Sequence, residues 1–322
     1  MNIIKSSVEE IINETPGKKI EVAGRTCYKS DSNINDTSYI KFISNIVKSG
    51  HCSVLEHERV CIKYDLRKGD PFATISQKDH MKFFNISQGK EEGIMYVSAN
   101  IRGWLDATSA PEIYYDNGTY AILKELYPFV FTRELKNTYL VEGATLDYPV
   151  CAEYVKESDI PEEIRELHDS KTFKIICNRS ISHQIVRHRS LSFSQQSQRY
   201  CNFSNDKFGH SIDFIMPEFK CNKKNPAADD EAIENIFKSA FEHAELEYFD
   251  LIDDGLKPED AREVLPNAAA TIIVVTGTTN DWIKFIELRD STHAQTEIRG
   301  LAQVIRTKLK VWRLKKLKIW VL

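Results

Sequence analysis

The sequence predicts an α+β fold, and three observations point to it. Hydrophobic residues make up 42% of the 322-residue chain and charged residues 28%, the composition of a globular protein with a core. Segments with helical spacing and short β-type segments are mixed along the chain, without the regular strand–helix–strand order of a parallel sheet. No internal repeat or low-complexity linker separates them, so we expect a single domain over residues 1–322.

The first half of the chain contains predicted helices and strands in irregular order. Residues 36–49 place apolar side chains at helical spacing, and Gly50 follows as a typical helix cap. Residues 59–66 alternate apolar and polar side chains, which is typical of a strand with one buried face. The other elements expected in this half are a strand over 94–97, a helix near 99–106 and a helix over 120–137.

The second half continues the mixed pattern. Residues 173–177 form a short apolar run typical of a strand, and the polar segment 186–200 is expected to begin at a helix end and continue as a loop. A long helix is predicted over 228–254, closed by Gly255. The remaining elements are a helix over 258–264 with Pro258 in its first turn, a strand over 270–275, and helices over 281–288 and 293–306.

Charge and cysteine content narrow the class of protein. A formal net charge of −4 gives no general attraction to nucleic acid or to a membrane, so any anion site must be a local patch. The chain has no opening of signal-peptide type and no run of about 18 apolar residues, which predicts a cytoplasmic protein. Its seven cysteines are widely spaced and include no CxxC pair, which argues against a disulfide framework and against a metal site.

Residues 170–205 contain no carboxylate but carry six cationic side chains: Lys171, Lys174, Arg179, Arg187, Arg189 and Arg199. Arginine forks bind phosphate through two parallel hydrogen bonds, and serine and glutamine add neutral donors. The segment therefore predicts a site for a phosphorylated ligand with a polar planar ring. The alternative is a solvated basic loop. The spacing of Leu191 and Phe193 between polar residues favours the binding site, because a solvated loop has no need for it.

The same segment resembles a known signature. Arg187, His188 and Arg189, followed after seven residues by Ser197, resemble the RHR-x7-S motif of flavin-dependent thymidylate synthases, and residues 198–200 continue the likeness. Three other blocks resemble this family in the family's order: 49–57 (SGHCSVLEH), 258–271 (PEDAREVLPNAAAT) and 285–302 (FIELRDSTHAQTEIRGLA). The likeness therefore covers most of the chain.

The resemblance implies a twisted, mostly antiparallel sheet with helices, assembled as a homotetramer whose active sites combine residues of several subunits. It implies reductive methylation of dUMP to dTMP, with methylenetetrahydrofolate as carbon donor, NADPH as reductant and FAD as hydride carrier, and without a cysteine nucleophile. No metal, nucleic acid or membrane is expected. Residues 67–170 then form an elaboration, and residues 306–322 a basic tail: a helix extension on the tetramer surface or, alternatively, a weak nucleic-acid or membrane contact.

The resemblance also assigns site residues. Those expected to bind the cofactor are His51, Ser53, Arg187, His188, Arg189, Gln195, Thr278, Asn280 and Lys284. Those expected to bind dUMP are Gln184, Arg187, Gln195, Gln196, Ser197, Gln198, Arg199, Arg262 and Arg289. Arg289 is expected to be catalytic, because a permanent cation beside the uracil imide favours electron density on the ring. Many relatives have Asn-x-Arg at 278–280 and His or Asn at 284, so this chain lacks one arginine charge there.

Several alternatives stay open. Arg262 could form a helix ion pair with Glu259, and His51 could cap helix carbonyls. His57 and His293 are expected to be structural, and residues 56 and 57 to lie in a strand. A flavin-binding protein that has lost methyl transfer is one alternative function. A single-strand nucleic-acid binder is another, with Phe193, Tyr200 and Phe203 as stacking surfaces, although the net charge argues against it.

Overall fold

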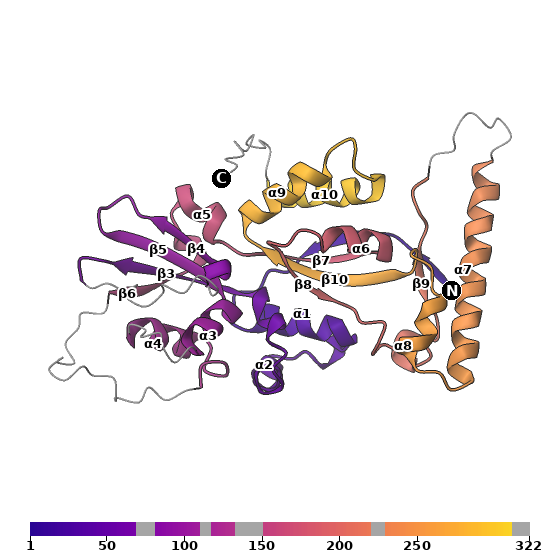
Figure 1. Cartoon of the computed structure of the whole chain (residues 1–322), viewed down its shortest axis with the longest axis horizontal. Helices are drawn as coiled ribbons and strands as arrows, with labels where there is room; N and C mark the ends of the chain where they lie inside the picture. Colours follow the sequence, from indigo (N-terminus) through magenta and orange to yellow (C-terminus); the bar gives the residue numbers. More distant parts are fainter. Residues whose placement is uncertain (69–80, 110–116, 133–150, 220–228, 311–322) are drawn as a thin grey trace.

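The computed structural model describes residues 1–68, 81–109, 117–132, 151–219 and 229–310 (Figure 1). These residues form two four-stranded antiparallel sheets, a short parallel strand pair and the helices that pack on them. The prediction of an α+β fold with mostly antiparallel sheets is therefore confirmed. We call residues 1–58 and 169–310 the first lobe, and residues 59–168 the second lobe.

The sheet of the first lobe has the strand order β2-β7-β10-β8, all antiparallel. Its strands are β2 (Ser7–Glu10), β7 (Lys171–Asn178), β8 (Ser192–Gln195) and β10 (Ala270–Gly277). Side chains alternate along β10, so Ile273 and Val275 join one buried cluster while Val274 joins another. Both faces of the sheet are therefore covered.

Helices cover the two faces of this sheet (Figure 1). On one side lie α1 (Lys18–Tyr28) and α2 (Ser38–Ser49), and on the other lie α6 (Arg179–Ile185), α9 (Thr279–Arg289) and α10 (Thr296–Lys308). The second cluster packs Phe173 and Ile175 of the sheet against Trp282 of α9 and Ile298 of α10. Ile181 and Ile185 of α6 belong to the same cluster, and their burial holds this short helix against the sheet.

The second lobe forms its own sheet, with the order β4-β5-β3-β6. Its strands are β3 (Arg59–Asp65), β4 (Phe84–Gln88), β5 (Ile94–Asn100) and β6 (Ala152–Val155). Its helices are α3 (Ile101–Ser109), α4 (Asn117–Leu126) and α5 (Glu162–His168). Tyr64, Val97, Trp104 and Leu123 are buried between the sheet and α3 and α4, in a cluster that continues into the first lobe through Ile20, Leu55 and Val274.

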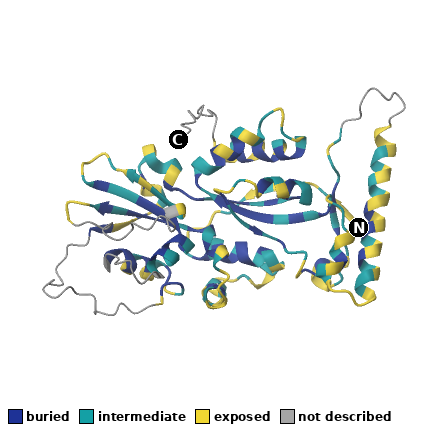
Figure 2. Ribbon diagram, viewed as in Figure 1, coloured by how far each residue is buried: buried dark blue, intermediate teal, exposed yellow. Residues whose placement is uncertain are grey.

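A third packing unit lies at the end of the molecule opposite to the second lobe (Figure 1). It contains the parallel pair β1 (Asn2–Ile4) and β9 (Asp213–Ile215), the long helix α7 (Asp230–Asp253) and the short helix α8 (Pro258–Ala261). Phe214 and Phe241 stack at a centroid distance of 4.8 Å. The outer side of α7 is exposed, as Figure 2 shows.

Most predicted elements are present, with shifted ends. Gly50 adopts φ 74° after α2 and Gly255 adopts φ 93° after α7, as expected of helix ends. The strand predicted over 94–97 continues to Asn100, so the next helix begins at Ile101. The helix expected over 258–264 is α-helical to Ala261 and then 3₁₀, and the one expected over 293–306 begins at residue 296.

Three expectations were wrong. The helix predicted over 120–137 ends at Leu126, and residues 133–137 lie outside the described part of the chain. Residues 192–195 form a strand rather than a loop, because β10 pairs with them and places Gln195 opposite Ile273. Residues 56 and 57 lie in a 3₁₀ helix over Cys52–His57 rather than in a strand. No helix in the described ranges is both long and apolar enough to cross a bilayer.

Candidate active site

The signature follows directly from the end of β7. Asn178 caps α6, because its side-chain oxygen accepts a hydrogen bond from the backbone N–H of Ile181 at 2.9 Å. Ile181 and Ile185 are buried against the sheet. These contacts fix the direction of α6, and the next residues, Arg187 to Arg189, emerge at its C-terminal end.

Arg289 joins two other predicted site residues. Its Nε donates to Nε2 of His188 at 2.9 Å, and a terminal nitrogen donates to the carbonyl oxygen of Gln184 at 3.0 Å. The other terminal nitrogen is 3.4 Å from Oε1 of Gln184. Three residues that the sequence assigned to one site thus meet, although about a hundred positions separate Arg289 from the other two.

The histidine in this group is neutral at physiological pH. Partial burial, together with the nearby charge of Arg289, lowers the pKa of His188 to about 4. The imidazole ring packs edge-on against Phe285 at a centroid distance of 4.8 Å. Because Nε2 accepts from Arg289, the ring holds the guanidinium in one orientation. Burial, together with the charge of Arg187, also lowers the pKa of Arg289.

Arg187 and Arg189 are exposed, and neither forms an ion pair with any residue that the structure describes. Together with Arg289 they place positive charge at the end of α6. A cluster of like charges without counter-ions is stabilised by an anion, and the guanidinium fork suits phosphate in particular. The exposed end of α6 is therefore chemically suited to a phosphorylated ligand.

A second group of cations lies around α8. Arg199 pairs with the carboxylate of Glu259 at 2.7 Å, and Arg262 donates to the backbone carbonyl of Glu259 at 3.0 Å. Burial lowers the pKa of Arg179, and the neighbouring charge of Arg262 adds to this effect. The expected alternative, a side-chain ion pair between Arg262 and Glu259, is wrong, because Arg199 occupies that carboxylate and Arg262 approaches Glu263 instead, at 3.5 Å.

The end of β8 and the residues that follow it form hydrogen bonds with other elements of the first lobe. The amide nitrogen of Gln195 donates to Ser182 at 3.0 Å and to Thr271 at 3.1 Å. The backbone N–H of Ser197 donates to the carbonyl oxygen of Cys27, at the C-terminal end of α1, at 3.0 Å. Of the other predicted residues here, Gln196 is buried and Gln198 is half-buried.

Some of the predicted cofactor residues at the start of α9 make contacts that stabilise this helix. Thr278 is buried and caps this helix, with its hydroxyl 2.8 Å from the carboxylate of Asp281. Lys284 is exposed and lies 3.5 Å from the same carboxylate. Asn280 is half-buried. Of these three, Lys284 has the most freedom to meet a ligand.

His51 and Ser53 are exposed at the start of the 3₁₀ helix. Nδ1 of His51 lies 3.4 Å from the hydroxyl of Ser49, and the carbonyls at the end of α2 are capped by backbone N–H groups of Gly50 and His51 rather than by the imidazole. No hydrogen bond or ion pair of the described residues joins His51 or Ser53 to the group around Arg289.

Sequence reasoning missed the polar contacts of two residues in this 3₁₀ helix, Glu56 and His57. The carboxylate of Glu56 binds Arg102 of the second lobe at 2.6 Å and accepts from Ser192 at 3.0 Å. His57 is fully buried, with its ring nitrogens 2.8 Å from Thr276 and 2.9 Å from Ser194, and burial lowers its pKa to about 3. The structural role expected of His57 fits this position. No sequence spacing could have predicted these partners.

Within the described residues no three histidine, cysteine or acidic side chains are arranged to hold a metal ion. Cys201, the cysteine next to the signature, is buried, and this burial raises the pKa of its thiol. An activated thiolate requires the opposite shift.

Comparisons with known proteins agree with the signature. Residues 166–313 match the family model of the thymidylate synthase complementing protein. The chain is 43% identical over 136 residues to the flavin-dependent thymidylate synthase of Geobacter sulfurreducens (42% of this chain, 54% of that protein). It is 35% identical over 144 residues to that of Sulfurisphaera tokodaii (44% and 51%) and 35% identical over 173 residues to that of Pyrococcus furiosus (51% and 67%).

The chain spans about half the length of the first two of these relatives. Among solved structures, a UMP/dUMP methylase PolB from Streptomyces cacaoi bound with 5-Br dUMP is 24% identical, with a TM-score of 0.38 over 47% of this chain and 69% of that one. A score this low adds nothing to the sequence matches. Those matches include the segment with Arg187, Ser197 and Arg289, and they cover two thirds of the Pyrococcus relative. The chain belongs to the flavin-dependent thymidylate synthase family.

Proposed function

We propose that the protein converts dUMP to dTMP in the cytoplasm by reductive methylation, with methylenetetrahydrofolate as carbon donor, NADPH as reductant and FAD as bound cofactor. The observation that carries this proposal is the contact of Arg289 with His188 and Gln184, which brings the two separate sequence blocks of the family together. Family membership supports the same reaction.

The end of α6 fits a flavin dinucleotide. Arg187 and Arg189 are exposed and without counter-ions among the described residues, so they can bind the pyrophosphate without breaking an existing ion pair. Ser53 is an exposed hydroxyl that can donate or accept a hydrogen bond. Bound FAD would supply the hydride chemistry that protein side chains lack.

Arg289 is placed to act on the uracil ring. A guanidinium has five N–H donors, and His188 and Gln184 engage three of them, so two remain for a ligand. Because His188 is neutral, it accepts from Arg289 without repelling it. In this proposal the oriented cation stabilises negative charge that develops on the uracil imide, and no enzyme nucleophile is needed.

The cations around α8 are suited to the phosphate of dUMP. Arg199 is largely exposed and, among the residues that the structure describes, pairs only with the carboxylate of Glu259, so a phosphate can compete for this guanidinium. Arg262 and Arg179 lie near each other and would both gain from an added anion. In this assignment Arg262 contributes mainly to dUMP binding and Arg289 mainly to turnover.

We also propose that the chain assembles as a homotetramer with sites shared between subunits. Val186, Tyr200 and Leu288 are apolar side chains that stay exposed beside the site cations. A neighbouring subunit would bury them and bring further residues to the site. Light scattering coupled to size-exclusion chromatography measures the mass directly, and a monomeric mass would contradict this assembly.

The reaction is tested with purified protein in two steps. FAD is first titrated into the apoprotein, and quenching of flavin fluorescence together with NADPH oxidation is followed. Addition of dUMP and methylenetetrahydrofolate should then produce dTMP, detected by mass spectrometry. Flavin binding without dTMP would support a flavoprotein that has lost methyl transfer, and absence of both responses would contradict the proposal.

A further inference from the structure

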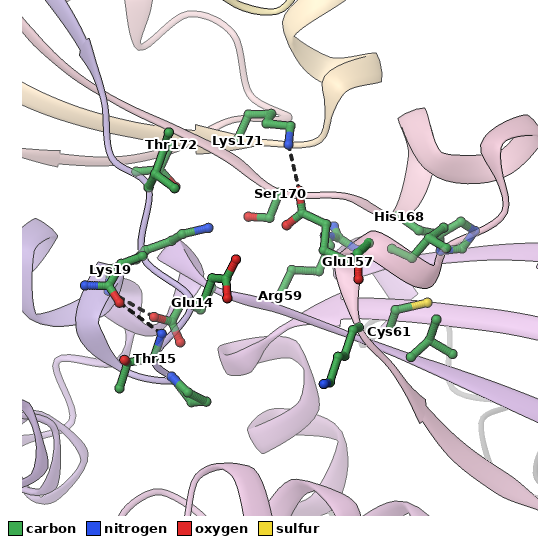
Figure 3. Close-up of a pocket in the computed structure, with 18 of the residues that line it drawn as sticks. Glu14, Thr15, Lys19, Arg59, Cys61, Glu157, His168, Ser170, Lys171 and Thr172 are labelled. Carbon is green, nitrogen blue, oxygen red and sulfur yellow. Dashed lines mark hydrogen bonds and ion pairs between the residues drawn. The ribbon is translucent and has the colours of Figure 1, made fainter.

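A cavity of about 610 Å³ lies at the junction of the two lobes (Figure 3). It is bounded by residues 10–19 of the first lobe, by the start of β7, and by β3, β6 and α5 of the second lobe. None of the site residues predicted above lines it. The signature follows the other end of β7, and this strand of eight residues spans roughly 25 Å. The cavity is therefore separate from the candidate active site.

A half-buried arginine that forms no ion pair with any described residue lines the cavity. Arg59 donates to the carbonyl oxygen and the hydroxyl of Ser98 at 2.8 and 2.9 Å, and more weakly to the carbonyl of Phe83 at 3.4 Å. All three acceptors are neutral. Burial lowers the pKa of Arg59 to about 10, and the negative charges of Asp281 and Asp169 oppose this shift. Because this pKa is well above 7, the guanidinium remains charged at pH 7. A partly desolvated cation of this kind favours a nearby anion.

Two further polar groups point into the same space. The hydroxyl of Ser170 is buried and has no hydrogen-bond partner among the described residues. Lys19 of α1 is half-buried and forms no ion pair within the described chain. In Figure 3 the ends of both side chains face the centre of the cavity from opposite sides. Both can donate a hydrogen bond to one ligand group placed between them.

Two of the acidic groups of the cavity wall already have partners. Glu157 pairs with Lys171 at 2.7 Å. The carboxylate of Glu58 accepts from the backbone N–H groups of Gly17 and Lys19 and from the hydroxyl of Tyr127. The other two, Glu10 and Glu14, are half-buried and exposed, respectively. The wall has five cationic side chains against these four acidic ones, and so a small excess of positive charge: Lys19, Arg59, Lys156, Arg165 and Lys171.

The rest of the wall is suited to an apolar body. Val155 and Ile160 are buried apolar residues of the second lobe, Ile11 adds an apolar side chain from the first, and Tyr127 adds an aromatic ring. The volume is within the range of small-molecule sites, about 300–1,000 Å³. We propose that this cavity binds a small organic anion, a carboxylate or phosphate ester with an apolar or planar body, held by Lys19, Arg59 and the hydroxyl of Ser170.

Isothermal titration calorimetry with the full-length chain tests this site. The probes are benzoate and phenyl phosphate, which differ in the anionic group, and benzyl alcohol, which has the same body without charge. At least one of the two anions should bind the wild type with a saturable signal, and benzyl alcohol should not. Lys19→Gln and Ser170→Ala should each weaken that binding by about tenfold or more, the cost expected for loss of one buried polar or charge-assisted contact.

A matched pair of variants locates the binding. Arg187→Ala/Arg189→Ala removes the cations of the candidate active site and should leave anion binding at the junction unchanged, while FAD binding falls. Lys238→Gln on the exposed side of α7 controls for loss of one positive charge. The proposal is overturned if neither anion binds, if Lys19→Gln binds as tightly as the wild type, or if the Arg187→Ala/Arg189→Ala variant loses the anion signal.

Discussion

The two lobes use their polar residues in different ways. In the first lobe, Arg187 and Arg189 lie just beyond the end of α6 and stay exposed without counter-ions among the described residues. In the second lobe, both ring nitrogens of the buried His168 lie 2.8 Å from serine hydroxyls, those of Ser98 and Ser87. Cationic side chains without counter-ions indicate where an anionic ligand can bind. Polar side chains whose hydrogen bonds are made within the protein indicate a structural role.

The second lobe nevertheless supports the site of the first. Glu58, which directly precedes the second lobe, accepts from Tyr127 at 2.7 Å and from the N-terminal backbone of α1. The C-terminal end of α1 in turn accepts from the backbone N–H of Ser197. The negative charge of Glu58 at a helix N-terminus is favourable. The second lobe thus contributes to the position of the signature serine through α1.

The largest effect expected is on turnover by the first lobe. Arg289→Ala should raise the activation free energy at saturating dUMP by about 2–4 kcal/mol, because one oriented charge is lost in the transition state. This change lowers the turnover rate roughly 30- to 900-fold. Arg262→Ala should mainly raise KM for dUMP, and Lys238→Ala on α7 should change neither constant. Steady-state kinetics compares the three variants. Equal behaviour of the two arginine variants would refute the separate roles given to them.

A smaller effect is expected on the stability of the junction. Tyr127→Phe removes a hydrogen bond to the buried carboxylate of Glu58 and should lower the free energy of unfolding by about 1.5–3 kcal/mol. Tyr96→Phe, in the same lobe, removes a hydroxyl for which no side-chain hydrogen bond is observed in the described chain, and should cost much less. Urea denaturation measures both. Similar losses in the two variants would show that the contact with Glu58 adds little.

The buried His57 predicts a dependence of the free energy of unfolding on pH. The folded pKa of His57 is about 3, below its unfolded value of about 6.5. Between these values the unfolded chain binds more protons, so the contribution of His57 is present above pH 6.5 and is lost as the pH falls. We expect about 2 kcal/mol less stability at pH 5 than at pH 7 from this residue.

A comparison of two histidine variants separates the contribution of His57 to this pH dependence from that of other residues. His57→Asn should show a pH dependence of unfolding smaller by that amount, whatever its stability at pH 7. His243→Asn, at an exposed position on α7, should keep the wild-type slope. The unfolding free energies are measured from pH 7 to pH 5. An unchanged slope in His57→Asn would mean that this ring is accessible to protons in the folded chain.

The smallest effect is expected at the cysteine beside the signature. Cys201→Ala should keep most dTMP-forming activity, because burial raises the pKa of this thiol and no nucleophile is required in the proposed reaction. The same is expected for the other six cysteines. A Cys201→Ala protein that folds and holds FAD but forms no dTMP, or a dUMP adduct found on Cys201 by mass spectrometry, would overturn this mechanism.

Local sequence signals predicted the elements that carry their own start and stop residues. Gly50 and Gly255 end α2 and α7 as expected, and the apolar run of β10 predicted its strand. In contrast, α1 was not predicted. Its N-cap is Gly17, which has no side chain, and Glu58 supplies the cap from 41 residues further along the chain.

In the candidate site, too, some features could be predicted from the sequence and others depend on contacts between distant segments. The resemblance predicted Gln184, His188 and Arg289 as site residues, and the structure places them in contact. The strand β8 was taken for a loop because its residues are mostly polar, and only the pairing with β10 makes it a strand. The ion pair between Arg102 and Glu56 depends on the docking of two lobes, so no local pattern in the sequence could indicate it.

The central claim is that dUMP binds the first lobe at the group formed by Gln184, His188 and Arg289. Photocrosslinking with 5-bromo-dUMP, followed by peptide mapping, tests where the pyrimidine lies in the FAD-loaded protein. We predict that the crosslinked peptide falls within residues 179–205 or 279–299, and that unlabelled dUMP prevents the reaction. A crosslink confined to residues 59–168 would place the pyrimidine in the second lobe and contradict this assignment.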